Sequence, residues 1–223
     1  MNHIKNVLRM KCGDEILVLD ESGMEYNCVI SGIGNDSVTA KITGRLVSYT
    51  ELPSKITLYQ GVPKGDKMDF IVQKCVELGV SRIVPVKCRR CIVKLDGKKE
   101  ESRLARWRKI SESAAKQSGR SVIPQIGEFL DFDAALLDAE ALDVLLIPYE
   151  KAVDIGITRK IFEGIAGGDS IGIFIGPEGG FEEAEVSAAV GHGARAVTLG
   201  RRILRTETAG VNVLSILGYL LEK

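Results

Sequence analysis

The chain has 223 residues, enough for one large domain or for a large domain with a small one. Hydrophobic residues make up 45% and charged residues 27%, which is ordinary for a folded globular protein and excludes a disordered chain. No stretch reaches the roughly 18 apolar residues of a membrane-spanning helix. Because the charged N-terminus also does not resemble a secretion signal, we expect a cytoplasmic protein with no membrane partner.

The first 60 or so residues favour β structure, with short apolar runs separated by turn residues. Strands this short and closely spaced predict a small barrel. A glycine- and proline-containing stretch at 61–66 marks the expected domain boundary, so we predict a barrel over 1–62 and a second domain over 66–223. The strand-like runs of this region lie at 16–19, 26–30, 38–42 and 56–59.

Beyond residue 66 the pattern changes to helices alternating with apolar strands. This alternation predicts an α/β domain with a largely parallel sheet covered on both faces. Ligands of such sheets bind at the carboxyl ends of the strands, which makes the following loops the candidate site. The predicted helices span 67–78, 102–118 and 207–221, and the predicted strands span 82–86, 122–126, 144–147, 171–175 and 196–199.

Basic and acidic residues are separated along this second region, although the formal net charge of the chain is zero. Residues 87–120 contain twelve basic and four acidic residues, and residues 128–154 contain eight acidic and one basic. A protein polarised in this way can present a basic face to a polyanion such as a nucleic acid. A solvated helix face explains the same run equally well.

The first candidate loop, GPEGGF at 176–181, follows the apolar strand 171–175. Its spacing matches neither a dinucleotide-binding loop nor a P-loop. Glu182, Glu183 and Glu185 then open a helix, where acidic residues favour the helix dipole but repel a phosphate. We therefore expect the glycines to let the backbone approach a ligand such as an adenine. An ordinary tight turn is the alternative.

The second candidate loop, GRRILRTETA at 200–209, places three arginines before the final helix, for which Thr206 is a suitable N-cap. The helix dipole disfavours cations at this position, so the arginines predict an anionic partner, with RNA phosphate the natural candidate. Ile203 and Leu204 indicate that the loop packs on other residues. The alternative is a solvated basic turn.

The two loops together, IGPEGGF and LGRRILRTETA, resemble those of the RsmE-type ribosomal RNA uridine-N3 methyltransferases of the SPOUT class. The segments KMDFIVQKCVELGVSRIVPV, RWRKISESAAKQSGRSVIPQI and LLIPYEK are similar to the family in order and spacing. The N-terminal HIKNVLRMKCGDEI is similar to the family's RNA-binding barrel of PUA type. The resemblance therefore covers nearly the whole chain.

This resemblance implies a SPOUT-type trefoil-knotted α/β domain preceded by a PUA-like barrel, and a homodimer built through the knot and the last helix. It implies S-adenosyl-L-methionine as the cofactor and N3 of a uridine in 16S ribosomal RNA as the methyl acceptor, either in naked RNA or in the assembled small subunit. The cofactor residues that it implies are Ile147, Pro148, Tyr149, Glu150, Ile175, Gly176, Pro177, Glu178, Gly179, Gly180, Leu199, Gly200, Arg202, Ile203, Leu204, Arg205 and Thr206.

Methyl transfer to uridine N3 is an in-line displacement that requires alignment, together with a base or an electrostatic field that favours the uridine anion. Arg202 and Arg205 are the candidates for this field or for holding the flanking phosphate, and Glu178 and Glu207 are the candidate bases. A structural role explains each glutamate as well, so the base stays open. The candidate RNA contacts are Arg9, Lys11, Lys74, Arg90, Gln117 and Arg120.

Cys88 and Cys91 have the C-x-x-C spacing of half a zinc site or a redox pair. Since His3 and His192 are isolated and no second cysteine pair follows, we expect no metal site and five reduced thiols. Two alternative functions stay open: a SPOUT methyltransferase that acts on another RNA, and a non-catalytic RNA-binding assembly factor of the ribosome.

Overall fold

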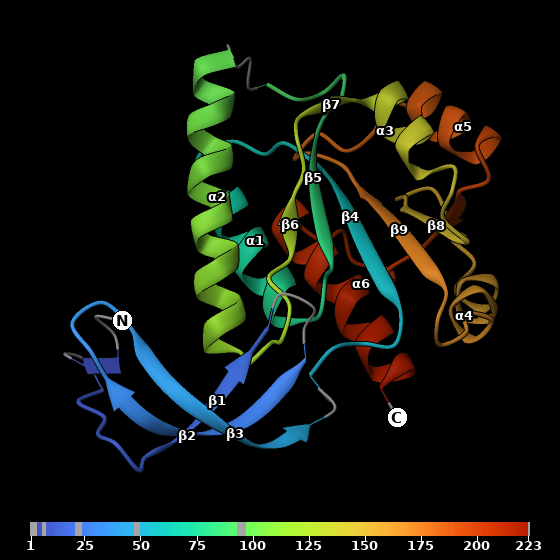
Figure 1. The fold of residues 1–223 in the computed structure, drawn as a ribbon. Helices are drawn as coiled ribbons and strands as arrows, with labels where there is room; N and C mark the ends of the chain where they lie inside the picture. The colour runs from blue at the N-terminus through green and yellow to red at the C-terminus, as the bar shows by residue number, and fades with distance from the viewer. Residues whose placement is uncertain (1–3, 6–7, 21–23, 47–49, 93–96, 223) are drawn as a thin grey trace. The chain divides into compact units, whose positions relative to one another are not determined.

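The computed structural model describes residues 4–5, 8–20, 24–46, 50–92 and 97–222 (Figure 1). Residues 93–96 of the basic segment and parts of the N-terminal segment lie outside the described residues. The chain divides into two compact units, Met1–Glu51 with Arg120–Val122, and Leu52–Gly119 with Ile123–Lys223. No helix in the described part of the chain is long and apolar enough to cross a membrane.

The smaller unit contains a three-stranded antiparallel sheet in the order β1-β2-β3. Its strands are β1 (Glu15–Leu19), β2 (Glu25–Ile33) and β3 (Val38–Leu46). Cys28 and Ile30 of β2 are buried, and the pairing of β2 with β3 shifts register on both sides of them. Such irregularities bend a strand and increase its twist. The β structure predicted for 16–19, 26–30 and 38–42 is confirmed.

One buried ion pair attaches residues 120–122 to this smaller unit. Arg120 has a side chain that is only 3% exposed, and its guanidinium donates two hydrogen bonds to the Glu51 carboxylate. Glu51 Oε1 also accepts the backbone N–H groups of Ser121 at 3.1 Å and Val122 at 3.2 Å. Burial raises the pKa of the Glu51 carboxyl, but Arg120 and these N–H groups outweigh it, so the pKa lies below its usual value.

The larger unit is built on a seven-stranded sheet in the order β10-β8-β9-β4-β5-β6, with β7 pairing with β5. All of these pairings are parallel. The strands are β4 (Lys55–Gly61), β5 (Arg82–Lys87), β6 (Gln125–Ile126), β7 (Leu130–Asp131), β8 (Val144–Pro148), β9 (Ser170–Ile175) and β10 (Arg195–Val197).

Helices cover both faces of this sheet, as predicted (Figure 1). One core joins α1, α2 and α6 to the sheet face that includes Ile56 and Leu58, and a second core joins α3 and α5 to the opposite face, which includes Tyr59. The helices are α1 (Lys67–Glu77), α2 (Gly97–Gln117), α3 (Phe132–Ala139), α4 (Ile155–Glu163), α5 (Glu183–Gly191) and α6 (Thr206–Leu221).

Two strand predictions require correction. Residues 56–59, assigned to the barrel, belong to β4, which lies between β9 and β5 in the larger sheet. Ile56, Leu58 and Tyr59 are all buried, because a parallel strand covered on both faces has no solvent side. The strand predicted at 122–126 shortens to β6 (Gln125–Ile126), since Glu51 holds the backbone of residues 121 and 122.

We predict that Glu51→Gln destabilises the protein by about 3 kcal/mol at neutral pH, because it removes the Glu51 charge that pairs with the buried Arg120 guanidinium. A lowered carboxyl pKa means that this stabilisation is complete above the usual pKa of a glutamate and disappears as the pH falls through the lowered value. Urea denaturation at neutral and at acidic pH measures both effects. The control is Glu112→Gln, which removes an exposed pair with Lys116 and should change little. Equal effects of the two substitutions at neutral pH would contradict the prediction.

Candidate functional site

Four neighbouring strands of the larger sheet end at the same edge. β10, β8, β9 and β4 are adjacent and parallel, so the loops at 198–205, 149–154, 176–182 and 62–66 all leave from their carboxyl ends. The backbone N–H of Tyr149, the first residue after β8, donates to the carbonyl of Val197 at the end of β10 at 3.0 Å. The loops that follow β8 and β10 therefore begin side by side. The prediction that the glycine-rich and arginine-rich loops follow parallel strands is confirmed.

The glycine-rich loop at 176–181 folds tightly against the end of β4. A Cβ atom on Gly61 would lie 2.7 Å from both the ring Cδ and the nitrogen of Pro177. A Cβ on Gly176 would lie 3.0 Å from the carbonyl carbon of Gly180, which itself has a φ of +66°. The backbone of this loop therefore packs in space that side chains fill elsewhere, which only glycine allows at these positions.

Acidic side chains occupy the start of α5 directly after this loop. Glu182 and Glu185 form a reciprocal capping box, in which Glu185 Oε2 accepts the backbone N–H of Glu182 at 2.8 Å. The other oxygen, Glu185 Oε1, accepts the backbone N–H of Arg89 at 2.8 Å. Carboxylates thus already use the positive end of this helix, which agrees with the expectation that no phosphate binds there.

A turn after β5 holds the glycine-rich loop from one side. Arg90 Nη1 donates to the carbonyl of Gly179 at 2.9 Å, and a Cβ on Gly179 would lie 3.2 Å from Arg90 Cβ. Arg89 reaches Glu182 at 3.3 Å. Arg90 is exposed, but its described contact is to the loop, so the structure gives this predicted RNA contact a second role as a support of the loop.

Buried hydrogen bonds connect the two candidate loops through Thr206. The Thr206 hydroxyl donates to the carbonyl of Gly176 at 2.7 Å and accepts from Gln60 Nε2 at 2.9 Å. Thr206 is the first residue of α6 and Arg205 is its N-cap, so the prediction of Thr206 as N-cap is wrong. Gln60 is fully buried at the end of β4, and its Oε1 has no hydrogen-bond partner among the described residues.

Lys67 lies between the two glutamates that were candidate bases. Its Nζ is 2.8 Å from Glu178 Oε1 and 3.8 Å from Glu207 Oε2. Glu178 Oε1 also accepts the backbone N–H of Lys64 at 3.0 Å. Burial raises the pKa of Glu178, but these donors outweigh it and lower the pKa below its usual value. Glu207 Oε2 is buried and has no hydrogen-bond partner within the described part of the chain.

The arginine-rich loop turns its cations to solvent. Arg201, Arg202 and Arg205 are exposed, and none forms an ion pair with another described residue. Of the two apolar residues expected to pack, Leu204 is half-buried, whereas Ile203 is 85% exposed on this chain. Unpaired arginines at one edge of a sheet form a surface that favours an anion.

The remaining RNA-contact candidates have different environments. Arg9 and Lys11 are exposed in the smaller unit, and Gln117 is exposed at the end of α2. Lys74, on α1, forms an ion pair with Glu77 at 2.8 Å. Arg120 requires correction, because its buried guanidinium is bound to Glu51 and is not available to a phosphate.

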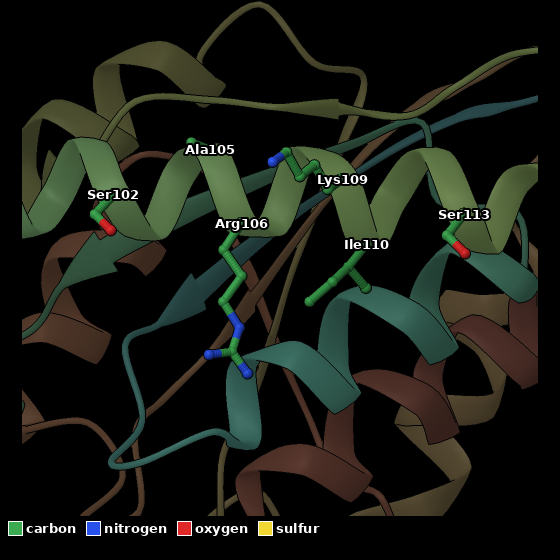
Figure 2. A pocket seen from close by; sticks show the side chains of 6 residues that line it. All are labelled: Ser102, Ala105, Arg106, Lys109, Ile110 and Ser113. Atoms are coloured by element: carbon green, nitrogen blue, oxygen red, sulfur yellow. The ribbon is translucent and has the colours of Figure 1, made fainter.

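A hollow of about 480 Å³ on the surface of α2 is not the cofactor site (Figure 2). Every residue that lines it comes from this one helix, whereas small-molecule sites collect polar groups from several elements. Figure 2 shows Arg106 pointing from α2 toward α1, where its guanidinium pairs with Asp69. Among the described residues, no group of three or more potential metal ligands occurs.

Gln60 and Lys67 are absent from the sequence-based candidates, although both meet the loops. The signal for Gln60 was an amide at the end of an otherwise apolar strand, where burial demands hydrogen-bond partners. Nothing comparable distinguished Lys67, because a lysine at the start of a helix is usually a solvated charge. Its position becomes meaningful only when Glu178 and Glu207 are brought beside it.

Comparison with known protein families agrees with this architecture. The model of an RNA methyltransferase domain matches residues 50–218, and the model of an RNA methyltransferase PUA domain matches residues 1–43. The fold, the loops at the carboxyl edge of its sheet and these two matches define the class as RNA methyltransferases that carry a PUA domain.

The ribosomal RNA small subunit methyltransferase E of Bacillus subtilis is 36% identical over 225 residues, which cover 100% of this chain and 88% of that protein. The crystal structure of the corresponding enzyme from Neisseria gonorrhoeae, bound to S-adenosyl methionine, is 35% identical with a TM-score of 0.81, and the match covers 98% of this chain and 88% of that one. A crystal structure of a protein described as hypothetical is 36% identical with a TM-score of 0.91, covering 99% and 88% of the two chains. The chain belongs to the ribosomal RNA small subunit methyltransferase E family.

We predict that Gly61→Ala lowers the free energy of unfolding by about 1–3 kcal/mol, because the new methyl group would overlap Pro177 and force the loop away from β4. The matched control is Gly191→Ala at the end of α5, where a Cβ meets nothing within 4 Å. Urea denaturation of both variants checks this. Equal stability of Gly61→Ala and the unchanged protein would show that the loop is not packed as described.

Proposed function

We propose that the chain transfers the methyl group of S-adenosyl-L-methionine to N3 of a specific uridine in 16S ribosomal RNA. One observation carries the proposal: Thr206 ties the glycine-rich loop, the arginine-rich loop and the end of β4 into one buried arrangement at the carboxyl edge of the sheet. The names of the relatives and the S-adenosyl methionine bound to the Neisseria enzyme support it.

The residues at this edge suit a nucleoside cofactor. A Cβ on Gly176 would fill space beside Gly180, so the loop presents its backbone, which suits main-chain recognition of an adenine edge. When bound, the cofactor supplies a methyl group on a positively charged sulfur. The residues that we propose to hold it are Ile147, Pro148, Tyr149, Glu150, Ile175, Gly176, Pro177, Glu178, Gly179, Gly180, Leu199, Gly200, Arg202, Ile203, Leu204, Arg205 and Thr206.

Arg202 and Arg205 are our candidates for the residues that act on the uridine. Both are exposed cations of the arginine-rich loop, and Arg205 is the N-cap of α6, whose first residue Thr206 bonds to the glycine-rich loop. A fixed positive charge favours the uridine anion formed when N3 loses its proton, and the same groups bind a flanking phosphate. N3 lies on the Watson–Crick edge, so the target base must be unpaired or flipped out of a helix.

The two glutamates differ in their suitability as the base that removes the N3 proton. Glu178 Oε1 is already bonded to Lys67 and to the backbone of Lys64, and its lowered pKa makes it a weak base. Its contacts support a structural role in holding the glycine-rich loop to α1. Glu207 Oε2 has no hydrogen-bond donor among the described residues, but it is buried 3.8 Å from Lys67 Nζ, so as the base it must first become accessible to the uridine.

RNA binding is assigned to exposed basic and polar side chains on each unit. In the smaller, PUA-like unit these are Arg9 and Lys11. In the larger unit they are Arg90 and Gln117, together with the half-buried Lys74, which is paired with Glu77. Such contacts to the RNA backbone position the substrate, while the arginine-rich loop acts at the target base. Either naked RNA or the assembled small subunit satisfies this arrangement.

We also propose that the protein forms a homodimer and that the last part of the chain follows a knotted path. We propose a cytoplasmic location for it. Apolar side chains at the arginine-rich loop and at the end of α6 support a dimer contact there. Ile203 and Tyr219 are each 85% exposed, and Leu220 is 43% exposed. Large exposed apolar groups of this kind mark surfaces that other proteins cover.

The test incubates the protein with methyl-labelled S-adenosyl-L-methionine and either naked 16S RNA or small subunits from a strain that lacks the modification. We expect label in the RNA and a primer-extension stop at one uridine, because N3 methylation blocks base pairing. Absence of label from both substrates, with a folded protein that binds the cofactor, would overturn catalysis and leave an RNA-binding assembly factor. A stop at another base would overturn the choice of uridine N3.

Variants of two arginines sharpen this test. Arg202→Ala should lower kcat by about 10²–10³-fold through loss of a charge that acts in the transition state. The control is Arg195→Ala, an exposed arginine at the opposite end of β10, which should keep the activity of the unchanged protein. Equal activities of these two variants would remove Arg202 from the reaction.

A further inference from the structure

Cys88 and Cys91 occupy the ends of the turn that supports the glycine-rich loop. The backbone N–H of Cys91 donates to the carbonyl of Cys88 at 3.0 Å, which closes a four-residue turn. In the opposite direction, the backbone N–H of Cys88 donates to Cys91 Sγ at 3.3 Å. Turns of this type bring their first and last Cα atoms within about 7 Å, a separation that a disulfide can span.

The two sulfur atoms face the same acceptor. Cys91 Sγ donates to the carbonyl oxygen of Val86 at 3.7 Å, and Cys88 Sγ lies 4.0 Å from the same oxygen. The two side chains therefore converge below the turn, and both cysteines are free thiols. Cys88 is buried and Cys91 is half-buried, so a reagent from solvent meets Cys91 first.

Cys91 also has the character of the attacking thiol. A hydrogen bond from the Cys88 thiol, together with the N–H groups of Cys88 and Val62, lowers the pKa of Cys91 to about 7. The same contact raises the pKa of Cys88. The negative charge of Glu185 opposes ionisation of both thiols and so raises the pKa of each. A half-buried thiolate beside a buried partner thiol is the arrangement of a redox-active pair.

We propose that Cys88 and Cys91 form a reversible disulfide that weakens cofactor binding; the second part rests on the proposed function. The oxidant is a small-molecule disulfide such as oxidised glutathione. The Cys91 thiolate attacks one of its sulfurs and releases a thiolate. Cys88 then loses its proton and attacks Cys91 Sγ, which forms the S–S bond and releases the second thiol. The two cysteines lose two electrons and two protons, which the small disulfide gains as two thiols.

The disulfide acts on the glycine-rich loop through Arg89 and Arg90, the two residues between the cysteines. Oxidation removes the thiol hydrogen bond to the carbonyl of Val86 and draws the two sulfurs to about 2.05 Å, and we expect the turn to shift in response. Arg90 holds the carbonyl of Gly179, and the N–H of Arg89 is bonded to Glu185. A shifted turn breaks these contacts and frees the glycine-rich loop. We expect the affinity for S-adenosyl-L-methionine to fall about tenfold.

Peptide mass spectrometry tests the disulfide without reference to activity. The protein is equilibrated with glutathione at graded ratios of oxidised to reduced form, its free thiols are alkylated, and it is cleaved with trypsin. Trypsin cuts after Arg89 and Arg90, so an internal disulfide joins two separate peptides, whereas reduced cysteines appear as two alkylated peptides. We expect the joined peptides, and their loss in Cys91→Ser. Glutathione on the exposed Cys12 alone, with Cys88 and Cys91 alkylated, would overturn the proposal.

Calorimetry with S-adenosyl-L-methionine tests the consequence. The oxidised protein should bind about tenfold more weakly than the reduced protein, and dithiothreitol should restore binding. Cys91→Ser should be insensitive to oxidation, and the matched control Cys12→Ser should respond as the unchanged protein does. Equal affinities of oxidised and reduced protein would overturn the coupling to the loop. Failure of the reduced protein to bind the cofactor would instead contradict the proposed function, while the joined peptides would still report the disulfide.

Discussion

The hydrogen bonds made by the Thr206 hydroxyl hold the candidate site together. One hydroxyl donates to the carbonyl of Gly176 and accepts from the amide of Gln60, and both interactions lie in the buried part of the larger unit. Three segments distant in sequence, the end of β4, the loop after β9 and the start of α6, thus meet at one atom. A buried polar group without its partner is costly, so each segment is fixed by the other two. This network restrains the glycine-rich loop that we assign to the cofactor.

Electrostatics then divide the site into two parts. The acidic groups are compensated: Glu185 and Glu182 cap α5, and Glu178 is bonded to Lys67 and to the backbone. The arginines of residues 201–205 have no such partners among the described residues and face solvent. A chain with no net charge therefore presents uncompensated positive charge beside the loop that we assign to the cofactor. This arrangement suits an enzyme that binds an uncharged adenine edge and a polyanionic substrate side by side.

Local patterns in the sequence predicted the α/β domain and both loops, because strand-to-helix alternation and glycine content are local properties. The strand at residues 56–59 was misassigned, since its apolar and β-branched residues suit an antiparallel barrel as well as a buried parallel strand. The site itself depended on contacts across the chain. The amide of Gln60 in an apolar strand indicates that it needs a partner but not which one, and the burial of Arg120 against Glu51 has no local signature. The reaction was inferred from the resemblance to a family, and the contacts of each side chain became known only from the structure.

The affinity of Thr206→Val for S-adenosyl-L-methionine tests this account most directly. Valine keeps the shape of the side chain but removes the hydroxyl, so the carbonyl of Gly176 loses its donor and the amide of Gln60 keeps only its bond to the carbonyl of Gly61. Calorimetry should show binding weakened by about tenfold, corresponding to the loss of roughly one buried hydrogen bond. Thr208→Val, two residues further along α6 and exposed, should bind as the unchanged protein does. Full affinity in Thr206→Val would contradict the claim that this hydroxyl organises the site.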